Sequence, residues 1–315
     1  MVKRLLSCTA SEIKRMTPME LKQAIQSSEG RTICSENVAI SQSVAGDITN
    51  AELASAYGAD LILLNGFDVF NPVVMGLPGS TNLQDIIDGV NDPHHLKKNP
   101  VDQLKYLTGR PVGVNLEPVD VNSNMNQTMT MISEGRKCTK ETLQAAQKLG
   151  FDFICLTGNP GTGVTNEKIA EAVSLAKENF FGLIIAGKMH GAGVDEEVFN
   201  MQAIESFIHA GADIILLPAV GTVPGVTDED VRDAVKLIRK NGALSMSAIG
   251  TSQESSDQET VKQIAIRNKI CGVDIQHIGD AGYSGLAPVE NIYAISIAIR
   301  GLRHTMNRVG TSINR

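Results

Sequence analysis

The residues of this chain that could do acid–base chemistry stand at the ends of short apolar runs. Glu36, Glu117, Lys188 and His190 each lie in or directly after such a run. Carboxylates, an amine and an imidazole in one site would supply general acids and bases for proton transfer at a carbonyl compound. Lys188 has three candidate roles: a Schiff-base amine with a pKa lowered by apolar walls, an acid–base or electrostatic group, or a structural residue.

A second set of polar residues follows similar runs and could orient a substrate: Asn65, Asn115, Asn159 and His277. Some of these residues could have a purely structural role. His190 and His277 could be hydrogen-bonded structural histidines, and each glutamate could form a salt bridge in a polar layer. The His94-His95 pair lies in a polar segment and is interpreted as solvated.

Three carboxylates, Glu36, Asp68 and Glu117, form an alternative set of hard oxygen ligands that would suit Mg²⁺. The chain contains no H-x-H or H-E-x-x-H pattern, which argues against zinc. The sequence therefore predicts no firm cofactor and keeps magnesium as the candidate metal.

Two late segments are rich in glycine and small polar residues, as phosphate-binding loops are. Backbone amides can approach an anion where glycines stand, and hydroxyl groups add donors. Both segments could also be simple tight turns. The predicted phosphate-binding residues are Gly250, Thr251, Ser252, Gly279, Asp280, Ala281 and Gly282.

A repeated pattern indicates which elements position these residues. A Gly-x-Asp triplet followed by an apolar run starts at Gly58, Gly150, Gly211 and Gly272, at spacings of 92, 61 and 61 residues. Sixty-one residues suit two strand–helix pairs, so four copies predict eight strands and eight helices. The longer first spacing predicts an insertion. The runs lack polar alternation, which is typical of parallel strands buried on both faces.

The chain is therefore predicted to be a single-domain (β/α)8 TIM barrel over residues 1–315. An open doubly wound sheet is the alternative, but the segment after the first strand lacks its glycine-rich fingerprint. A helical leader is expected at 1–30 and inserted loops over the barrel mouth at 66–100 and 118–138. The strands are expected at 32–38, 61–65, 112–117, 153–157, 183–188, 214–218, 244–249 and 274–278.

In architecture and in the two late loops, the chain resembles phosphate-binding barrel enzymes such as aldolases, isomerases and phosphoenolpyruvate-mutase-like lyases. In such barrels the active site lies at the carboxyl ends of the strands, and the loops after strands seven and eight often bind phosphate. The resemblance implies that the candidate residues above meet at this end of the barrel.

The amino-acid composition limits the classes of molecule that this chain is expected to bind. The chain has 315 residues, 42% of them hydrophobic, and a net charge of −7 without long charged runs. This balance argues against nucleic acid and membrane surfaces. Five widely spaced cysteines without a C-x-x-C motif predict reduced thiols and a cytoplasmic location. The amphipathic last helix is compatible with a homo-oligomer.

The sequence thus predicts a cytoplasmic enzyme acting on a small phosphorylated carbonyl or sugar compound. The reaction would be that of an aldolase-like lyase or an isomerase, through an imine or enol intermediate. Two alternatives stay open: a magnesium-assisted lyase or hydrolase that uses the strand-end carboxylates, and a non-catalytic metabolite-binding barrel.

Overall fold

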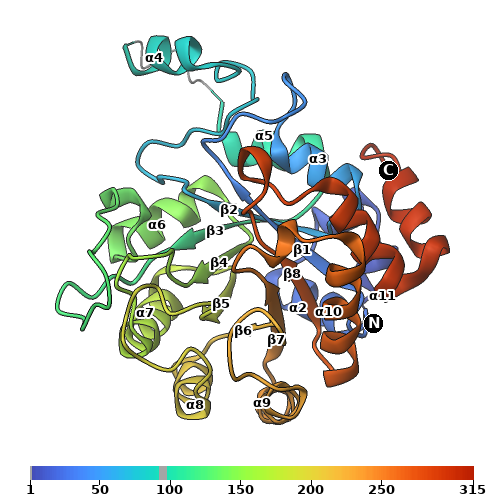
Figure 1. The fold of residues 1–315 in the computed structure, drawn as a ribbon. Coiled ribbons are helices and arrows are strands. Elements are labelled where there is room, and N and C mark those ends of the chain that lie inside the picture. Colours follow the sequence, from blue (N-terminus) through green and yellow to red (C-terminus); the bar gives the residue numbers. More distant parts are fainter. Residues whose placement is uncertain (1, 92–97) are drawn as a thin grey trace.

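Eight parallel strands close a barrel at the centre of the computed structural model, which describes residues 2–91 and 98–315 (Figure 1). Each strand pairs with the next along the chain, and the first pairs with the last. The predicted fold class is confirmed; His94 and His95 lie outside the described residues. The strands are β1 Thr32–Val38, β2 Leu61–Asn65, β3 Val112–Leu116, β4 Phe153–Leu156, β5 Leu183–Gly187, β6 Ile214–Pro218, β7 Leu244–Ile249 and β8 Ile275–Ile278.

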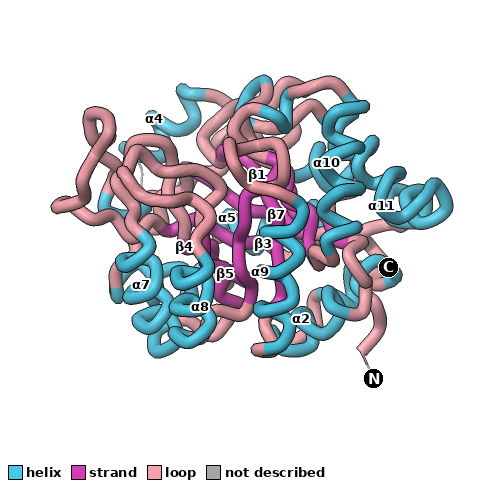
Figure 2. Tube along the Cα trace, turned by 60° about the horizontal axis from the view of Figure 1, so that its bottom comes forward, coloured by secondary structure: helices cyan, strands magenta, loops and turns pink. Residues whose placement is uncertain are grey.

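Helices surround the barrel, as Figures 1 and 2 show from two directions. They are α1 Ala10–Ile13, α2 Pro18–Gln26, α3 Asn50–Ala56, α4 Leu83–Asn91, α5 Pro100–Thr108, α6 Lys140–Leu149, α7 Asn166–Asn179, α8 Met201–Ala210, α9 Asp228–Lys240, α10 Gln258–Cys271 and α11 Val289–Gly310. Short 3-10 turns lie at Leu5–Ser7, Glu134–Arg136, Gln253–Ser255 and Tyr283–Gly285. Across the described residues, no helix is long and apolar enough to cross a membrane.

The strand boundaries differ from expectation at four ends, each by one residue. At β5 the cause is visible: Gly187 has a φ of +149°, and a Cβ there would come within 2.1 Å of the Leu216 carbonyl oxygen. Only glycine fits this position, so the strand ends before Lys188. Asp257 caps α10, because its carboxylate accepts the Thr260 amide.

The leader and the inserted loops lie at opposite ends of the barrel. Leu5, Leu21 and Ile25 of the leader pack in one cluster with side chains inside the barrel, so the leader covers the amino-terminal end of the strands. The loops after β2 and β3 are the long ones, as predicted, and the first carries α4, which stands away from the barrel in Figure 1. The first loop is held to the second by the Val69 amide, which donates to the Gly135 carbonyl at 3.1 Å.

The aspartate of each Gly-x-Asp repeat joins the two strands of its unit. It stands just before an even-numbered strand, and one of its oxygens accepts an amide at the start of the preceding odd-numbered strand. The four bonds are Ile33 to Asp60 at 2.9 Å, Val112 to Asp152 at 2.8 Å, Ile184 to Asp213 at 3.1 Å and Ser245 to Asp274 at 2.9 Å. The repeat therefore marks a structural device, not a catalytic motif.

Each of these aspartates also has a cationic partner. Lys105 lies 2.8 Å from Asp152, Lys22 lies 3.2 Å from Asp213, and Arg239 lies 3.6 Å from Asp274. The most buried member is Asp60, whose two oxygens lie 2.6 Å from Arg300 and 2.7 Å from Arg308 of α11. The cations come from helices and the leader, so these ion pairs attach the outer layer to the barrel.

We expect Asp60→Asn to lower the free energy of unfolding by about 3–5 kcal/mol, because it leaves buried guanidinium groups without a carboxylate. Urea unfolding followed by circular dichroism would measure this loss. The control is Asp233→Asn, which removes an exposed pair with Lys236 on α9 and should change stability by less than about 0.5 kcal/mol. Equal losses in the two variants would contradict the role given to Asp60.

Candidate active site

The inward-facing side chains of the barrel change from apolar to polar towards the carboxyl ends of the strands. Cys34 and Ile275 belong to the apolar cluster inside the barrel. Two residues further along the same strands, on the same face, stand Glu36 and His277. The change follows from the period of two in a strand, and it places a buried polar layer directly above the apolar one.

Glu36 is the centre of this layer. The Asn115 side-chain amide donates to Glu36 Oε1 at 2.5 Å, and His277 Nε2 lies 3.1 Å from Glu36 Oε2. The His277 side chain is fully buried and Glu36 is 3% exposed. A carboxylate and an imidazole held together away from water form a pair that can pass or store a proton. The sequence-predicted residues Glu36, Asn115 and His277 thus come together.

Asp280 lies beside this pair, at the start of the loop after β8. Its Oδ2 accepts the Asn65 side-chain amide at 2.8 Å, and Asn65 also exchanges amide hydrogen bonds with Asn159 at 2.8 and 2.9 Å. Burial, and then the charge of Glu36, raise the pKa of Asp280 to about 7. Asp280 was predicted as part of a phosphate loop, but a carboxyl group that titrates near neutrality is suited to donate and accept protons.

Glu117 has a positioning role. Its Oε1 accepts from Arg136 Nη2 at 2.7 Å and from the Asn159 side chain at 2.8 Å, and its Oε2 accepts the Asn159 amide at 2.8 Å. With both oxygens bound, this carboxylate holds the loops after β3 and β4 in place and orients Asn159. Arg136 was not among the predicted site residues. Its place in a long loop, 19 residues after Glu117, gave no signal that the two would pair.

Lys188 is buried and already has a partner. Its ammonium is ion-paired with Glu196, whose carboxylate also accepts the Asn166 amide at the start of α7 at 2.8 Å. In the alternation of β5, Lys188 falls on the side of Ile184 and Ala186, which pack between the sheet and the helices. Burial lowers the pKa of Lys188, opposed by the bond to Glu196. This arrangement favours the electrostatic role over the Schiff base.

His190 connects the predicted catalytic residues. Its Nδ1 accepts the Ala192 amide at 3.0 Å, so in the neutral ring the proton is on Nε2. Burial lowers the pKa of His190, while the charges of Glu36, Lys188 and Glu117 also act on it. The shared catalytic role of Glu36, Glu117, Lys188 and His190 stays a prediction.

The loops after β7 and β8 are less open to an anion than the sequence suggested. The Ala281 amide donates to Glu254 Oε1 at 3.1 Å, the Gly279 amide to the Ile249 carbonyl at 2.9 Å, and the Gly282 amide to the Asp280 carbonyl at 2.8 Å. Gly250 packs against Met189, and Thr251 donates to the Thr222 carbonyl at 2.5 Å. The phosphate site stays a prediction. One of its predicted residues, Asp280, carries a carboxyl group, which can donate a hydrogen bond to phosphate only when protonated.

Glu254 is a second residue of this region, after Arg136, that sequence reasoning missed. Its side chain is buried against Gly279, where a Cβ would come within 2.4 Å of Oε1. Burial raises the pKa of Glu254, and its other oxygen has no hydrogen-bond partner in the described part of the chain. Glu254 stands between Gln253 and Ser255 in a polar loop, and this position offered no hint of its burial.

The alternative magnesium ligands are not brought together. Asp68 Oδ1 accepts the Phe70 and Asn71 amides at 2.8 and 3.0 Å, and Glu117 is bound as described above. Over residues 2–91 and 98–315, no group of three or more His, Cys, Asp or Glu side chains is placed to hold a metal ion. The set Glu36, Asp68 and Glu117 therefore does not fit the ion for which it was predicted.

Backbone strain gathers at the same end of the barrel. Five described non-glycine residues have a positive φ, and four of them lie in loops after β5, β7 and β8: Ala192, Thr251, Ser252 and Ser284. Such conformations persist where the surrounding structure holds them, and they are common at functional sites. This pattern supports the barrel mouth as the working end of the protein.

We expect Asp280→Asn to change how stability depends on pH. The pKa of Asp280 in the folded protein, about 7, is above its ordinary value of 3.8, so its contribution is present below about pH 4 and is lost as the pH rises through 7. The loss is on the order of 1–4 kcal/mol. Urea unfolding at a series of pH values would show a smaller decline in Asp280→Asn than in the unchanged protein. Asp233→Asn should keep the full decline.

A family model described as a domain of unknown function (DUF7916) matches residues 6–315. No curated protein matches the chain in sequence.

Solved structures similar in fold include a 2,3-dimethylmalate lyase described as a PEP mutase/isocitrate lyase superfamily member, at 14% identity and a TM-score of 0.45, covering 86% of this chain and 81% of that chain. Oxaloacetate acetylhydrolase in complex with oxalate matches at 13% identity and a TM-score of 0.44, covering 83% and 79%. Thiamine phosphate pyrophosphorylase from Pyrococcus furiosus matches at 13% and 0.45, covering 87% and 98%. The likeness is one of fold alone.

Proposed function

We propose that this chain, which belongs to the family described as domain of unknown function (DUF7916), is an enzyme that moves a proton on a small carbonyl compound. The reaction is that of a lyase or an isomerase passing through an enol. The observation that carries the proposal is the buried Glu36–His277 pair, with Asp280, whose pKa is raised to about 7, beside it. Together they place a proton acceptor and a proton donor at the mouth of one barrel.

The steps follow from the contacts. Glu36, held by the Asn115 amide, accepts the proton from the carbon next to the carbonyl group, and Asp280 in its protonated form donates to the carbonyl oxygen. The C–H bond and the Asp280 O–H bond break, and O–H bonds form on Glu36 and on the enol oxygen. The electron pair of the C–H bond becomes part of the enol double bond. In a lyase, Glu36 instead takes the proton of a substrate hydroxyl group, and the electrons of that O–H bond form a new carbonyl group. The adjacent carbon–carbon bond breaks, and its electrons form the enol, whose oxygen takes the Asp280 proton. His277 Nε2 lies 3.1 Å from Glu36 Oε2 and is placed to take up the proton from it.

The remaining polar residues serve binding. Asn65 and Asn159 face Asp280 through their paired amides, and Lys188 and Arg136 place positive charge near the rim. We keep the phosphorylated substrate as part of the proposal. Its phosphate would have to meet the loops after β7 and β8 with Glu254 protonated, a form that the raised pKa of Glu254 favours. The five free thiols support the proposed cytoplasmic location.

Proton exchange tests the proposal without knowledge of the full reaction. The protein would be incubated in D2O with dihydroxyacetone phosphate, dihydroxyacetone, oxaloacetate and pyruvate, and loss of the C–H signal would be followed by NMR. Enzyme-dependent exchange would support enol formation, and exchange of the phosphorylated compound alone would support the phosphate site. Saturable binding of these compounds without exchange would favour the metabolite-binding barrel. Loss of exchange on chelation would favour the metal-assisted alternative.

We expect Glu36→Gln to lower the rate of exchange by about 100- to 10,000-fold, because the amide cannot accept the proton. The amide has nearly the shape of the carboxylate, so the protein should still fold, which circular dichroism would check. Glu259→Gln, on the exposed side of α10, is the matched control and should keep the full rate. A Glu36→Gln protein as active as this control would remove Glu36 from the reaction.

The role of Lys188 can be separated from imine chemistry. Lys188 is engaged with Glu196, so we expect no covalent adduct when the protein is treated with borohydride in the presence of the exchanging substrate. Mass spectrometry would detect such an adduct. Lys188→Met should weaken exchange through lost positive charge, not abolish it. An adduct on Lys188 would instead establish the imine route.

A further inference from the structure

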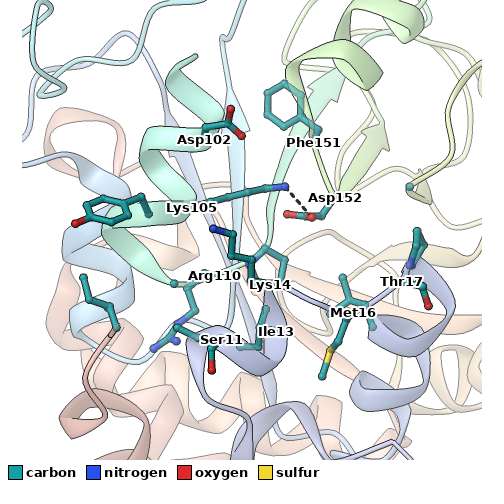
Figure 3. Close-up of a pocket in the computed structure, with 18 of the residues that line it drawn as sticks. Ser11, Ile13, Lys14, Met16, Thr17, Asp102, Lys105, Arg110, Phe151 and Asp152 are labelled. Carbon is teal, nitrogen blue, oxygen red and sulfur yellow. Dashed lines mark hydrogen bonds and ion pairs between the residues drawn. The ribbon is translucent and has the colours of Figure 1, made fainter. Parts of the chain in front are cut away.

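A cavity lies at the opposite end of the barrel from the proposed active site. It has a volume of about 810 Å³, within the range of small-molecule sites. Its walls come from the leader, from α5, from the segments that enter β3, β4 and β5, and from residues 313–315 (Figure 3). These segments lead into the strands, so the cavity is at their amino-terminal ends, away from Glu36 and Asp280.

The cavity is basic although the chain is acidic. Four basic residues line it against two acidic ones, while the whole chain has a net charge of −7. One acidic residue, Asp152, is already bound to Lys105 at 2.8 Å and to the Val112 amide. Within the described residues, Lys14, Arg110 and Arg315 have no carboxylate in ion-pair distance, because none of them forms a salt bridge there.

Arg110 is the strongest sign of a missing anion. Arg110 is only 7% exposed, and the charges of Arg300 and Arg308 act on it in the interior. The buried carboxylate of Asp60 is ion-paired with Arg300 and Arg308, and within the described residues it forms no ion pair with Arg110. A buried excess of positive charge is costly unless an anion offsets it. Arg110 lines the cavity, so an anion bound there could supply that charge.

The hydrogen bonds of Arg110 leave room for such a partner. Nε donates to the Ala59 carbonyl at 2.9 Å and Nη2 to the Arg308 carbonyl at 3.4 Å. Nη1 makes no hydrogen bond in the described part of the chain. In Figure 3, Lys14 extends from the leader into the space between the leader and α5, where Lys105 and Asp152 form their pair. A second cation thus stands in the same cavity.

The rest of the lining is suited to an apolar body. Tyr106 and Phe181 line the cavity and are each 75% exposed, and Ile313 is 41% exposed. Large exposed apolar side chains around one basic cavity are unusual for a surface that only meets water. They would cover the ring or chain of a ligand whose charged group is held inside.

We propose that this cavity binds a small organic anion, with its carboxylate or phosphate group between Arg110 and Lys14 and its apolar part against Tyr106 and Phe181. The site is separate from the proposed active site and does not depend on the reaction there. A bound anion joins the leader to α5 and offsets the charge of the arginine group, so it should also stabilise the fold.

Isothermal titration of the full chain with phenyl phosphate and with benzoate tests the site, with benzyl alcohol as the uncharged comparison. We expect saturable binding of one equivalent of at least one anion, and none of the alcohol. The relative affinities of the two anions show whether phosphate or carboxylate is the better charged group. No saturable binding of either anion would overturn the proposal.

Variants locate the binding. Lys14→Gln changes an exposed residue and should fold, and we expect it to weaken anion binding at least tenfold; Arg110→Met should do the same where it folds. Lys240→Gln, an exposed lysine on α9, and Glu36→Gln at the barrel mouth should bind as the unchanged protein does. Binding unaffected by Lys14→Gln, or lost in Glu36→Gln, would overturn the assignment to this cavity. So would sedimentation showing that this face, disrupted by Phe181→Ser, instead joins two copies of the chain.

Discussion

Four aspartates at the amino-terminal ends of the strands connect the barrel to its outer layer. Each aspartate bonds an amide of the preceding strand and a cation of the outer layer, so a single side chain joins two strands and one helix or leader residue. Without these bonds, buried strand amides at the edge of the sheet would lack partners. Asp60 has the most connections, because Arg308 also donates to the Leu5 and Cys8 carbonyls and thereby holds the leader under the barrel.

The two ends of the barrel consequently differ in charge. The amino-terminal end gathers arginines and lysines around its aspartates, and their excess reaches the cavity lined by Arg110 and Lys14. The carboxyl end gathers buried acids, where Glu36 and Glu254 both raise the pKa of Asp280. The first arrangement favours an anionic ligand and the second favours proton transfer. The two proposed sites therefore differ in chemistry.

The polar residues at the barrel mouth are joined in one hydrogen-bond network. Glu117 bonds to both the Asn159 backbone and side chain, and Asn159 in turn bonds to Asn65, which bonds to Asp280. The loops after β2, β3, β4 and β8 are therefore connected through side-chain amides and carboxylates. A network of this kind holds an acid at a fixed place, which general acid–base catalysis requires.

The sequence by itself determined the architecture. The Gly-x-Asp triplets and the apolar runs are local signals, and they place β1, β2, β6 and β7 at the observed residues. The period of two within a strand is equally local, so Glu36, Asn115 and His277 could be predicted to meet. Only the tertiary structure decided the partners. Glu196 pairs with Lys188, Arg136 with Glu117, and Glu254 with the Ala281 amide. These contacts depend on the paths of loops, and loop sequences have no periodic pattern that predicts their paths. The same holds for the cavity under the barrel. Its walls are far apart in the sequence, and only the fold brings Lys14 and Arg110 to the same cavity.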